Sequence, residues 1–343
     1  MMELKYISRS PRPVIHMTQY EEQGYRTYRG KRIAVVVPAY NEELLILETL
    51  ASIPEFVDRV FIIDDSSTDT TLDKARGYSE MDPRVTVIHH EKNLGVGAAI
   101  VTGYKAALHE DIDITAVMAG DNQMDPDFLP HLLDPVVDEK ADYSMGNRLV
   151  NRDFRQGMSR WRFFGNSILT LLTKIASGYW QMVDPQNGYT AISRRALNTI
   201  PLDSIYPGYG YCNDVLVQLN VYGFRVKNVP HPSRYGRETS GIRYSTYIVR
   251  LSRLLLKDFL WRLKMKYVVL GFHPLVFYYF FGVVFCMLGI LGGAWSLYFK
   301  LVQNGPIFLP AVVSLLLIGL GAQGILFAML FDMQMEKNSG WYE

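Results

Sequence analysis

The chain has 343 residues, of which 49% are hydrophobic and 20% are charged, and this composition excludes an intrinsically disordered protein. Its 35 lysines and arginines nearly balance its 34 aspartates and glutamates, so the net charge of +1 excludes a strongly basic protein of the kind that grips nucleic acid. Two cysteines, Cys212 and Cys286, are too few for a disulfide framework or a cysteine-built zinc site.

The first 230 residues predict an arm followed by an α/β domain. Residues 1–30 are polar and suggest an arm without a fold of its own. Short apolar runs then alternate with amphipathic stretches, and the runs lie at residues 33–37, 60–63, 85–88 and 114–117. This alternation predicts a mainly parallel sheet with crossover helices over residues 31–243. The turns that follow parallel strands meet at one edge of the sheet, where ligands usually bind.

Polar side chains follow the first two predicted strands. Pro38 is expected to end the first strand, and Asn41 can cap the next helix. After the second strand, the carboxylate of Asp65 can accept hydrogen bonds from a base N–H or a ribose hydroxyl. Ser67 or Thr68 can cap the helix that follows. Helix capping alone would also explain either turn.

The next two turns suggest a ligand and a metal ion. Gly95 and Gly97 follow the third strand, where glycines let the backbone approach a ligand at an electropositive helix N-terminus. The spacing is not that of a dinucleotide-binding motif. After the fourth strand, Asp121 and Gln123 present hard oxygen atoms of the type that Mg²⁺ or Mn²⁺ prefers. Asp125 is expected to cap the helix opened by the proline that follows it.

Two long uncharged segments predict a membrane hairpin. Residues 274–299 and 306–331 carry no charged side chain, and a membrane-spanning helix needs about 20 apolar residues. The alternative is a pair of buried core helices. The short link at residues 300–305 returns both ends of the hairpin to the same side. Six cations within residues 250–266 then place the large domain in the cytoplasm.

The segment before the hairpin predicts an interfacial helix over residues 244–267. Basic residues alternate there with apolar residues. The apolar residues recur at helical spacing and are Ile248, Leu251, Leu255, Phe259 and Leu263. We expect this helix to lie on the membrane surface with its cations near anionic headgroups. The alternative is a solvated helix that joins the domain to the membrane. Residues 268–333 then form the two transmembrane helices, and residues 334–343 form a cytoplasmic tail.

Four motifs on successive strands resemble the family 2 glycosyltransferases, which have the GT-A fold. They are PAYNEE at 38–43, DDSSTDTT at 64–71, NLGVGAA at 93–99 and GDNQMDP at 120–126. The segments at 146–148 and 184–189 resemble the same family. With the hairpin included, the chain most resembles the polyprenyl-phosphate (dolichyl-phosphate) glycosyltransferases.

The resemblance implies roles for individual residues. A nucleotide site would be formed by Pro38, Tyr40, Glu42, Asp65, Gly95, Gly97 and Asp121. Asp121, a catalytic residue, would hold Mg²⁺ or Mn²⁺ with help from Gln123. The family usually has another aspartate two residues before this one, where the chain has Ala119, and this departure weakens the expected metal shell.

The acceptor side is expected among later residues. By the same resemblance, the acceptor phosphate would be held by Arg148, Arg160 and Arg162, although a solvated basic helix also explains these arginines. The sugar or acceptor would contact Asp184, Gln186 and Asn187. Asp214, the second catalytic candidate, could act as a base, bind a sugar hydroxyl or cap a helix. The glycines and cations of residues 234–241 suggest a loop that closes over a diphosphate.

These observations predict a membrane-bound inverting glycosyltransferase. It would move a sugar from a nucleotide sugar to a polyprenyl or dolichyl phosphate, with UDP-glucose or UDP-N-acetylglucosamine favoured as donor over GDP-mannose. One alternative is a polysaccharide or glycerolipid acceptor, and another is a non-catalytic membrane scaffold. The expected partners are the donor, the acceptor and membrane lipids, without nucleic acid; a homo-oligomer is compatible with the sequence.

Overall fold

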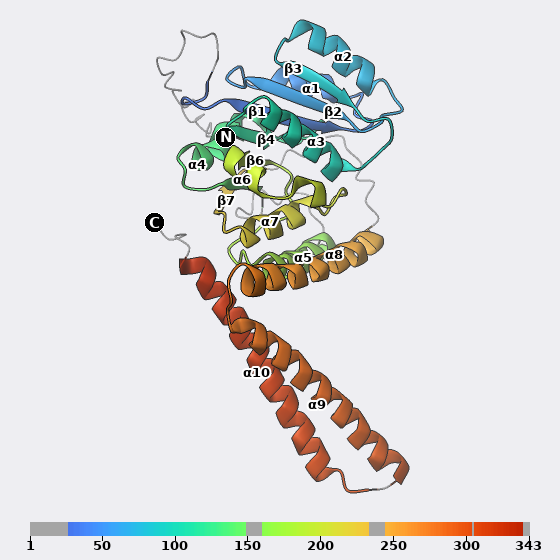
Figure 1. Ribbon diagram of the computed structural model, residues 1–343. Helices are drawn as coiled ribbons and strands as arrows, with labels where there is room; N and C mark the ends of the chain where they lie inside the picture. Colours follow the sequence, from blue (N-terminus) through green and yellow to red (C-terminus); the bar gives the residue numbers. More distant parts are fainter. Residues whose placement is uncertain (1–26, 149–159, 233–243, 304, 339–343) are drawn as a thin grey trace, which may run out of the picture.

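The computed structural model describes residues 27–148, 160–232, 244–303 and 305–338 (Figure 1). A seven-stranded sheet has the order β3-β2-β1-β4-β6-β5-β7. Only β6 among these strands runs opposite to its neighbours, so the prediction of a mainly parallel sheet is confirmed. The strands are β1 (Ile33–Ala39), β2 (Arg59–Asp64), β3 (Val85–His89), β4 (Ile114–Val117), β5 (Tyr143–Asn147), β6 (Thr190–Ser193) and β7 (Val226–Pro230).

Helices cover both faces of the sheet because the central strands are apolar on both sides. Along β1, Ala34 and Val36 face one core, whereas Ile33, Val35 and Val37 face the other. The first core is closed by α3 (Val96–His109), α6 (Arg194–Thr199) and α7 (Tyr211–Val221). The second core is closed by α1 (Ile46–Ser52), α2 (Thr71–Met81) and α4 (Leu129–Val137).

Two local expectations at the start of the domain are wrong. Pro38 does not end β1, which continues to Ala39; the strand tolerates the missing N–H because β4 is paired with β1 only as far as Val36. The domain also begins earlier than the predicted arm allows. Tyr28 is buried in the second core and donates a hydrogen bond to Asp134 over 2.8 Å.

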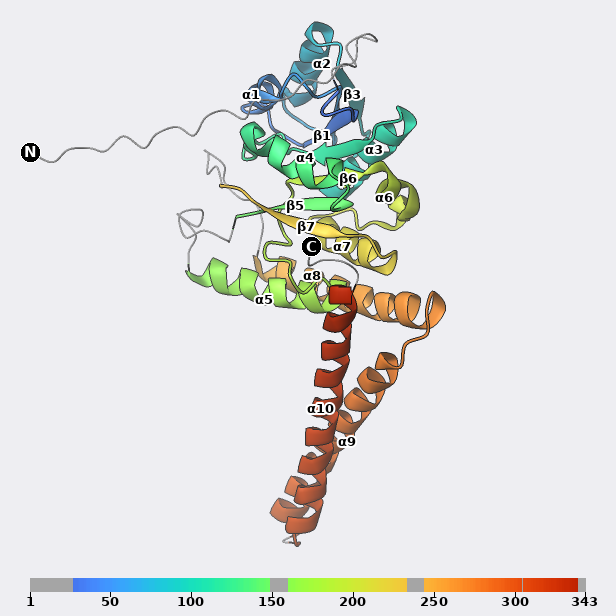
Figure 2. The same ribbon diagram turned by 90° about the vertical axis from the view of Figure 1, so that its left-hand side faces the viewer.

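Two long helices lie side by side beneath the sheet domain (Figure 2). They are α5 (Arg160–Ser177) and α8 (Tyr244–Lys264), and α8 continues into a π-helical turn, η5 (Met265–Val269). Leu251 and Leu255 of α8 pack with Leu169 of α5 and Val217 of α7. The apolar face that we expected to touch the membrane therefore packs against the protein instead.

The outward side of α8 carries a different set of residues. Its exposed hydrophobic side chains are Val249, Leu256 and Leu260, and its exposed cations include Arg253 and Lys257. These positions recur three or four residues apart and therefore share one face of the helix. A surface for lipid headgroups, if α8 provides one, must use this row.

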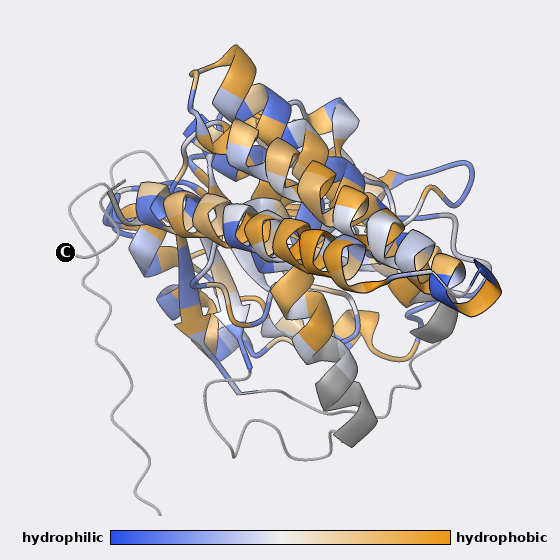
Figure 3. Cartoon of the chain, turned by 90° about the horizontal axis from the view of Figure 1, so that it is seen from below, coloured by the Kyte–Doolittle hydropathy of each residue, from blue (hydrophilic) through white to orange (hydrophobic). Residues whose placement is uncertain are grey.

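The predicted hairpin is present as α9 (Leu275–Gln303) and α10 (Phe308–Asn338). Both helices extend away from the sheet domain (Figure 1). Two segments, Leu275–Gln303 and Phe308–Glu336, are long and apolar enough to cross a membrane. Figure 3 shows both helices as predominantly hydrophobic. Their backbones approach closely at Gly321, where an added Cβ would lie 2.6 Å from the amide nitrogen of Cys286.

Candidate active site

The four motif-bearing turns meet at the carboxyl edge of the parallel strands. The register aligns Ala39 with Asp64 and Asp64 with His89, so the ends of β1, β2 and β3 lie level. β4 ends beside β1, and the turn after it carries Asp121. The structure thus brings together, at one edge of the sheet, motifs that lie far apart in the sequence, as expected for a ligand site in an open α/β sheet.

The first two turns are joined by hydrogen bonds. The amide of Glu42 donates to the Thr71 hydroxyl over 2.8 Å, and the Thr68 amide donates to the Asn41 side-chain oxygen over 2.8 Å. Asn41 therefore does not cap α1, which begins only at Ile46, and neither Ser67 nor Thr68 caps α2. The polar residues of these motifs hold the two turns in one rigid unit, beside which the Tyr40 ring is 47% exposed.

Asp65 organises the third turn. Its two carboxylate oxygens accept hydrogen bonds from the amides of Leu94 (2.9 Å) and Gly95 (2.8 Å), and one oxygen lies 2.8 Å from Nδ1 of His90. The side chain is buried, as is Pro38 on the neighbouring strand. The predicted contacts of Pro38, Glu42 and Asp65 with a nucleotide stay predictions.

The glycines of the third motif allow a close approach, but the group that approaches is the chain itself. Gly97 and Ala98 donate their amides to the carbonyl of Pro207, at 2.7 and 3.2 Å. A Cβ on Gly97 would lie 2.3 Å from the Tyr206 carbonyl oxygen. The expectation that this helix N-terminus presents its amides to a ligand is therefore wrong for Gly97, because the 206–208 turn occupies that position. Gly95, with φ of 95°, supplies the bend before the helix.

Asp121 lies in the fourth turn. Its Oδ1 accepts a hydrogen bond from the amide of Gln123 over 3.1 Å, and burial raises the pKa of its carboxyl. Ala119, at the position where the family usually has an aspartate, donates its amide to the sulfur of Met124 over 3.2 Å. The predicted cap is confirmed, since Asp125 accepts from the amide of Asp127 over 3.1 Å.

The donor set fits a hard divalent cation that shares its shell with a substrate. A half-buried carboxylate with a raised pKa gains from a nearby positive charge. Within the described ranges, no three histidine, cysteine, aspartate or glutamate side chains converge on one point. Asp121, with Gln123 beside it, would therefore hold Mg²⁺ or Mn²⁺ mainly together with diphosphate oxygens, as is common for Mg²⁺ in proteins.

The predicted acceptor residues Arg148 and Asp184 bind each other. The Arg148 Nε lies 2.7 Å from Oδ2 of Asp184, and Nη2 lies 3.1 Å from Oδ1, in a forked ion pair. Asp184 is buried, whereas the arginine side chain is 32% exposed. An acceptor phosphate would have to share this arginine with Asp184. Arg160 is the first residue of α5, and its side chain, that of Arg162 and the loop 234–241 lie outside the described residues.

Gln186 and Asn187 each bind a side chain that lies far along the chain, namely Asn213 and His231. Gln186 donates to the side-chain oxygen of Asn213 over 3.3 Å, and Thr173 of α5 donates to the same oxygen over 2.8 Å. Asn187 lies 2.7 Å from Nε2 of His231, whose Nδ1 faces the carbonyl of the next residue. Burial lowers the pKa of His231, which fits a neutral ring that donates through Nδ1.

The buried amide nitrogen of Asn213 has no hydrogen-bond partner in the described part of the chain. A buried donor without a partner is costly, and the usual remedy is a water molecule or a ligand atom. Gln186, which is partly exposed and binds Asn213, is the neighbour through which this position could reach the sugar or acceptor, and that contact stays a prediction. The sequence analysis missed Thr173, which no local signal marks because its contact with Asn213 joins residues 40 positions apart.

Asp214 is buried in α7 and does not cap that helix. It accepts hydrogen bonds from the amide of Tyr206 over 2.6 Å and from Gln218 over 3.4 Å. Burial raises the pKa of its carboxyl. Its contacts stabilise the 206–210 turn that packs on Gly97, and a catalytic role stays a prediction.

A second buried acid, Asp258 of α8, lies near Asp214. One oxygen of Asp258 has no hydrogen-bond partner among the described residues, and burial together with the Asp214 charge raises its pKa to about 7. The folded state therefore holds a proton that the unfolded chain, with a pKa of 3.8, releases. Stability should fall as the pH rises through this window.

We expect Asp258→Asn to raise the free energy of unfolding by about 1–3 kcal/mol at pH 8 and by less at pH 5, since an amide carries no charge to bury. Thermal unfolding of the detergent-solubilised protein at both pH values measures this. The exposed Asp203, which pairs with Lys105, gives the control Asp203→Asn. Equal shifts at pH 5 and pH 8 would contradict the assignment.

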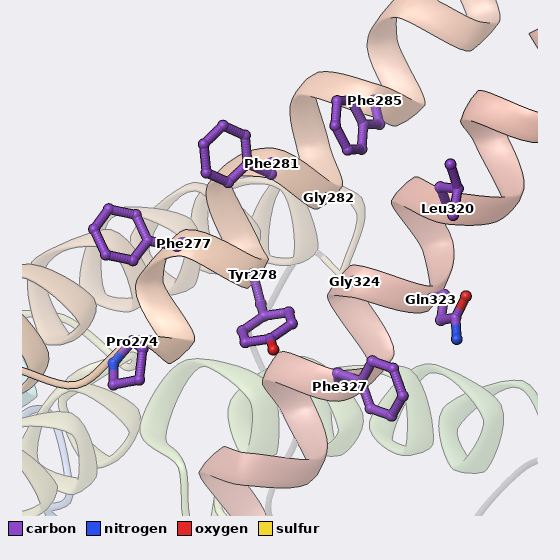
Figure 4. A pocket seen from close by; sticks show the side chains of 10 residues that line it. All are labelled: Pro274, Phe277, Tyr278, Phe281, Gly282, Phe285, Leu320, Gln323, Gly324 and Phe327. Carbon is purple, nitrogen blue, oxygen red and sulfur yellow. The ribbon is translucent and has the colours of Figure 1, made fainter.

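A separate apolar groove lies between α9 and α10 (Figure 4). Its volume is about 600 Å³, and most of its lining is aromatic or glycine. Gln323 is the one side chain with an amide among the residues that line it, which are Pro274, Phe277, Tyr278, Phe281, Gly282, Phe285, Leu320, Gln323, Gly324 and Phe327. The groove belongs to the hairpin and is separate from the strand ends.

Comparison with known proteins gives relatives for the sheet domain. The sequence profile of "Glycosyl transferase family 2" matches residues 34–200. The UDP-N-acetylglucosamine–dolichyl-phosphate N-acetylglucosaminyltransferase of Methanococcus voltae is 28% identical over 218 residues, which cover 60% of this chain and 86% of the relative. The undecaprenyl-phosphate mannosyltransferase of Micrococcus luteus is 30% identical over 208 residues, which cover 58% of this chain and 82% of the relative.

The fold is also found in a solved structure. Glucosyl-3-phosphoglycerate synthase from Mycobacterium tuberculosis, in complex with Mn²⁺, UDP and phosphoglyceric acid, aligns with a TM-score of 0.51 and 23% identity. The alignment covers 68% of this chain and 79% of that chain. With the GT-A-like sheet, the four motifs at its carboxyl edge and these relatives, the chain belongs to glycosyl transferase family 2 and is a glycosyltransferase.

Proposed function

We propose that this protein is a membrane-anchored, inverting glycosyltransferase that moves a sugar from a nucleotide sugar to a polyprenyl phosphate. The observation that carries the proposal is that one chain contains both a glycosyltransferase sheet domain and a pair of apolar helices. Asp121 lies at the carboxyl edge of the parallel strands, where open α/β sheets bind ligands, and the same domain is attached to two apolar helices long enough to span a bilayer. Both relatives named above are described as acting on a polyprenyl-type phosphate.

The catalytic domain would lie on the cytoplasmic side of the membrane. Arg250, Arg253, Lys257 and Lys264 are exposed on α8, close to the start of the hairpin, whereas the hairpin turn carries Lys300. Cations near the ends of spans favour the cytoplasmic side. α5 and α8 lie across the base of the hairpin (Figure 2), so the exposed row on α8 would meet the headgroup region.

In this proposal the residues of the chain bind and orient, and no strong base is required. Tyr40 would contact the base of the donor, and Asp121 would hold the diphosphate end through the cation, which when bound neutralises negative charge on the departing diphosphate. The phosphate of the acceptor is already anionic at neutral pH. Arg148, Arg160 and Arg162 would orient it for an in-line displacement with inversion at the anomeric carbon.

The donor is proposed to be UDP-N-acetylglucosamine or UDP-glucose, with GDP-mannose as the second candidate. The relative from Methanococcus voltae is described as using UDP-N-acetylglucosamine, and that from Micrococcus luteus as a mannosyltransferase. The sequence from Ala119 to Asp125 favours the UDP-sugar group by resemblance.

A transfer assay on membranes tests the proposal. Membranes that contain the protein are incubated with Mg²⁺ or Mn²⁺, one polyprenyl phosphate and a panel of radiolabelled UDP- and GDP-sugars. We expect one donor to give a labelled lipid that mild acid cleaves, and we expect no such product when the free prenol replaces its phosphate. Label in a polysaccharide or a glycerolipid would show a different acceptor, and no labelled product with any donor would support a non-catalytic scaffold.

A further inference from the structure

A buried ion pair connects the hairpin to the catalytic domain. Arg262, on α8, has no exposed surface, and Asp332, on α10, is 2% exposed. The pair is forked, with Nη1 2.8 Å from Oδ1 and Nη2 2.9 Å from Oδ2. Arg262 was expected to face lipid headgroups, and this expectation is wrong because its partner lies on the helix that returns from the hairpin.

Arg262 also binds the carboxyl end of α5. Its Nε donates to the carbonyl of Ala176 over 2.8 Å, and Nη2 donates to the carbonyl of Ile175 over 3.0 Å. The last carbonyls of a helix lack partners within the helix and carry partial negative charge, so a guanidinium is favourable there. One side chain thus ties together α8, α10 and α5.

Neighbouring contacts hold the same junction. The Tyr267 hydroxyl donates to Asp332, and Lys266 donates to the side-chain oxygen of Asn220 over 2.7 Å. One turn further along α10, Glu336 accepts from the amide of Trp180 over 2.9 Å. The domain end of α10 is therefore fixed to the segment after α5 as well as to α8.

The junction is close in sequence and structure to the acceptor side of the site. Thr173 lies one turn before Ala176 on α5 and holds the Asn213 oxygen that Gln186 also contacts. α5 begins at Arg160, so two of the three arginines expected to bind the acceptor phosphate, Arg160 and Arg162, lie on the same helix. Because α5 contacts both the hairpin and the acceptor side of the site, the orientation of the hairpin relative to α5 determines where the head of a membrane-held acceptor lies.

A buried ion pair is a poor way to gain stability alone, because removing two charges from water offsets most of their attraction. A forked arginine–carboxylate pair does fix direction, since both of its hydrogen bonds require one relative orientation. We propose that Arg262 and Asp332 are positioning residues that set the angle of the hairpin to α5, so that an acceptor held in the bilayer presents its head beside Gln186 and the arginines expected to bind its phosphate. This inference rests on the proposed function.

The kinetic test compares two acceptors in the full-length protein. Asp332→Asn keeps the shape of the side chain and removes its charge. We expect its KM for a long polyprenyl phosphate in membranes to rise about tenfold, as expected for lost orientation. The KM for the donor and the turnover of a short, water-soluble prenyl phosphate should stay unchanged. Asp203→Asn, the same change in an exposed pair, should alter none of these values.

A distance measurement reads the angle directly. Spin labels at Met81→Cys and Leu301→Cys, both on exposed positions, report the separation of the domain from the hairpin turn. The background carries Cys286→Ala, whereas Cys212 is buried and can remain. We expect one narrow distance in the wild type and a broader distribution in Asp332→Asn.

The outcomes separate the inference from the proposed function. If Asp332→Asn does not fold, Tyr267→Phe removes one hydrogen bond to Asp332 and should raise the same KM less strongly. The positioning role would be overturned if the KM for the long acceptor stayed unchanged in Asp332→Asn, or if activity fell equally with the long and the short acceptor. Either result would leave lipid transfer by the wild type intact. If the wild type uses neither acceptor, the proposed function fails and the inference fails with it.

Discussion

Asp121→Asn is expected to lower the rate of sugar transfer by about 100- to 1,000-fold, a loss comparable to that of one main electrostatic contact with a transition state. The amide keeps the hydrogen bond from the Gln123 amide but loses the charge that would hold a divalent cation. The remaining activity should respond weakly to added Mg²⁺ or Mn²⁺, and a chelator should reduce the wild type to a similar level.

This variant should lose activity without losing stability. Burial raises the pKa of the Asp121 carboxyl, so the ionised group weakens the folded state once the pH exceeds its ordinary pKa of 3.8. An uncharged side chain removes that penalty at neutral pH. Transfer rates and thermal unfolding are measured on the same preparation, with Asp127→Asn, an exposed site in the same loop, as the matched control. Full divalent-dependent activity in Asp121→Asn would exclude the metal site.

Gly97→Ala should reduce the free energy of unfolding by about 3 kcal/mol, the upper range for overpacking a well-filled site. The added Cβ would lie 2.3 Å from the Tyr206 carbonyl oxygen and 2.8 Å from Cβ of Tyr211. These contacts are backbone or close to it, so the 206–208 turn must move away from α3. Donor binding should weaken as well, because the turn and the third motif support each other through Pro207.

A second glycine offers the matched control for this change. Gly77 lies in α2 with nothing within 4 Å of an added Cβ. Gly77→Ala should therefore stabilise the protein by about 0.5–1 kcal/mol, the usual difference between alanine and glycine in a helix. Chemical unfolding followed by circular dichroism measures both variants. A Gly97→Ala protein as stable as the wild type would show that the turn adapts freely.

The sheet and the hairpin could be predicted from the sequence because both depend on local patterns. Apolar runs bounded by polar turns identified β1 to β4, and uncharged stretches identified α9 and α10. The position of Asp121 at the sheet edge followed from the same reasoning. These features need only the order of residues along the chain and the rule that parallel strands end together.

The details of the site could not be predicted, because they depend on contacts between distant residues. Asn41 has the chemistry of a helix cap, but its side chain binds Thr68 on the next turn. Gly97 has the chemistry of a ligand-binding glycine, but Pro207 is the group beside it. A short motif states which hydrogen bonds a residue can make, whereas the rest of the fold decides which partner is nearest.

The same limit applies to α8. Helical spacing identified an apolar face on Leu251, Leu255 and Leu263, and the structure buries all three. Periodicity cannot distinguish a face that meets lipid from one that meets another helix. Arg262 was expected among the surface cations, because the residues around it in the sequence do not indicate that it binds Asp332, which lies 70 residues away.

That separation of 70 residues has a consequence for how the protein is made. A ribosome releases Arg262 well before it synthesises Asp332, and the two apolar helices emerge in between. Until α10 has been synthesised and packs against α8, the Arg262 guanidinium lacks the carboxylate of Asp332. In the proposed membrane-anchored protein, closure of this junction therefore comes only after both apolar helices have been made, so the catalytic domain completes its base last.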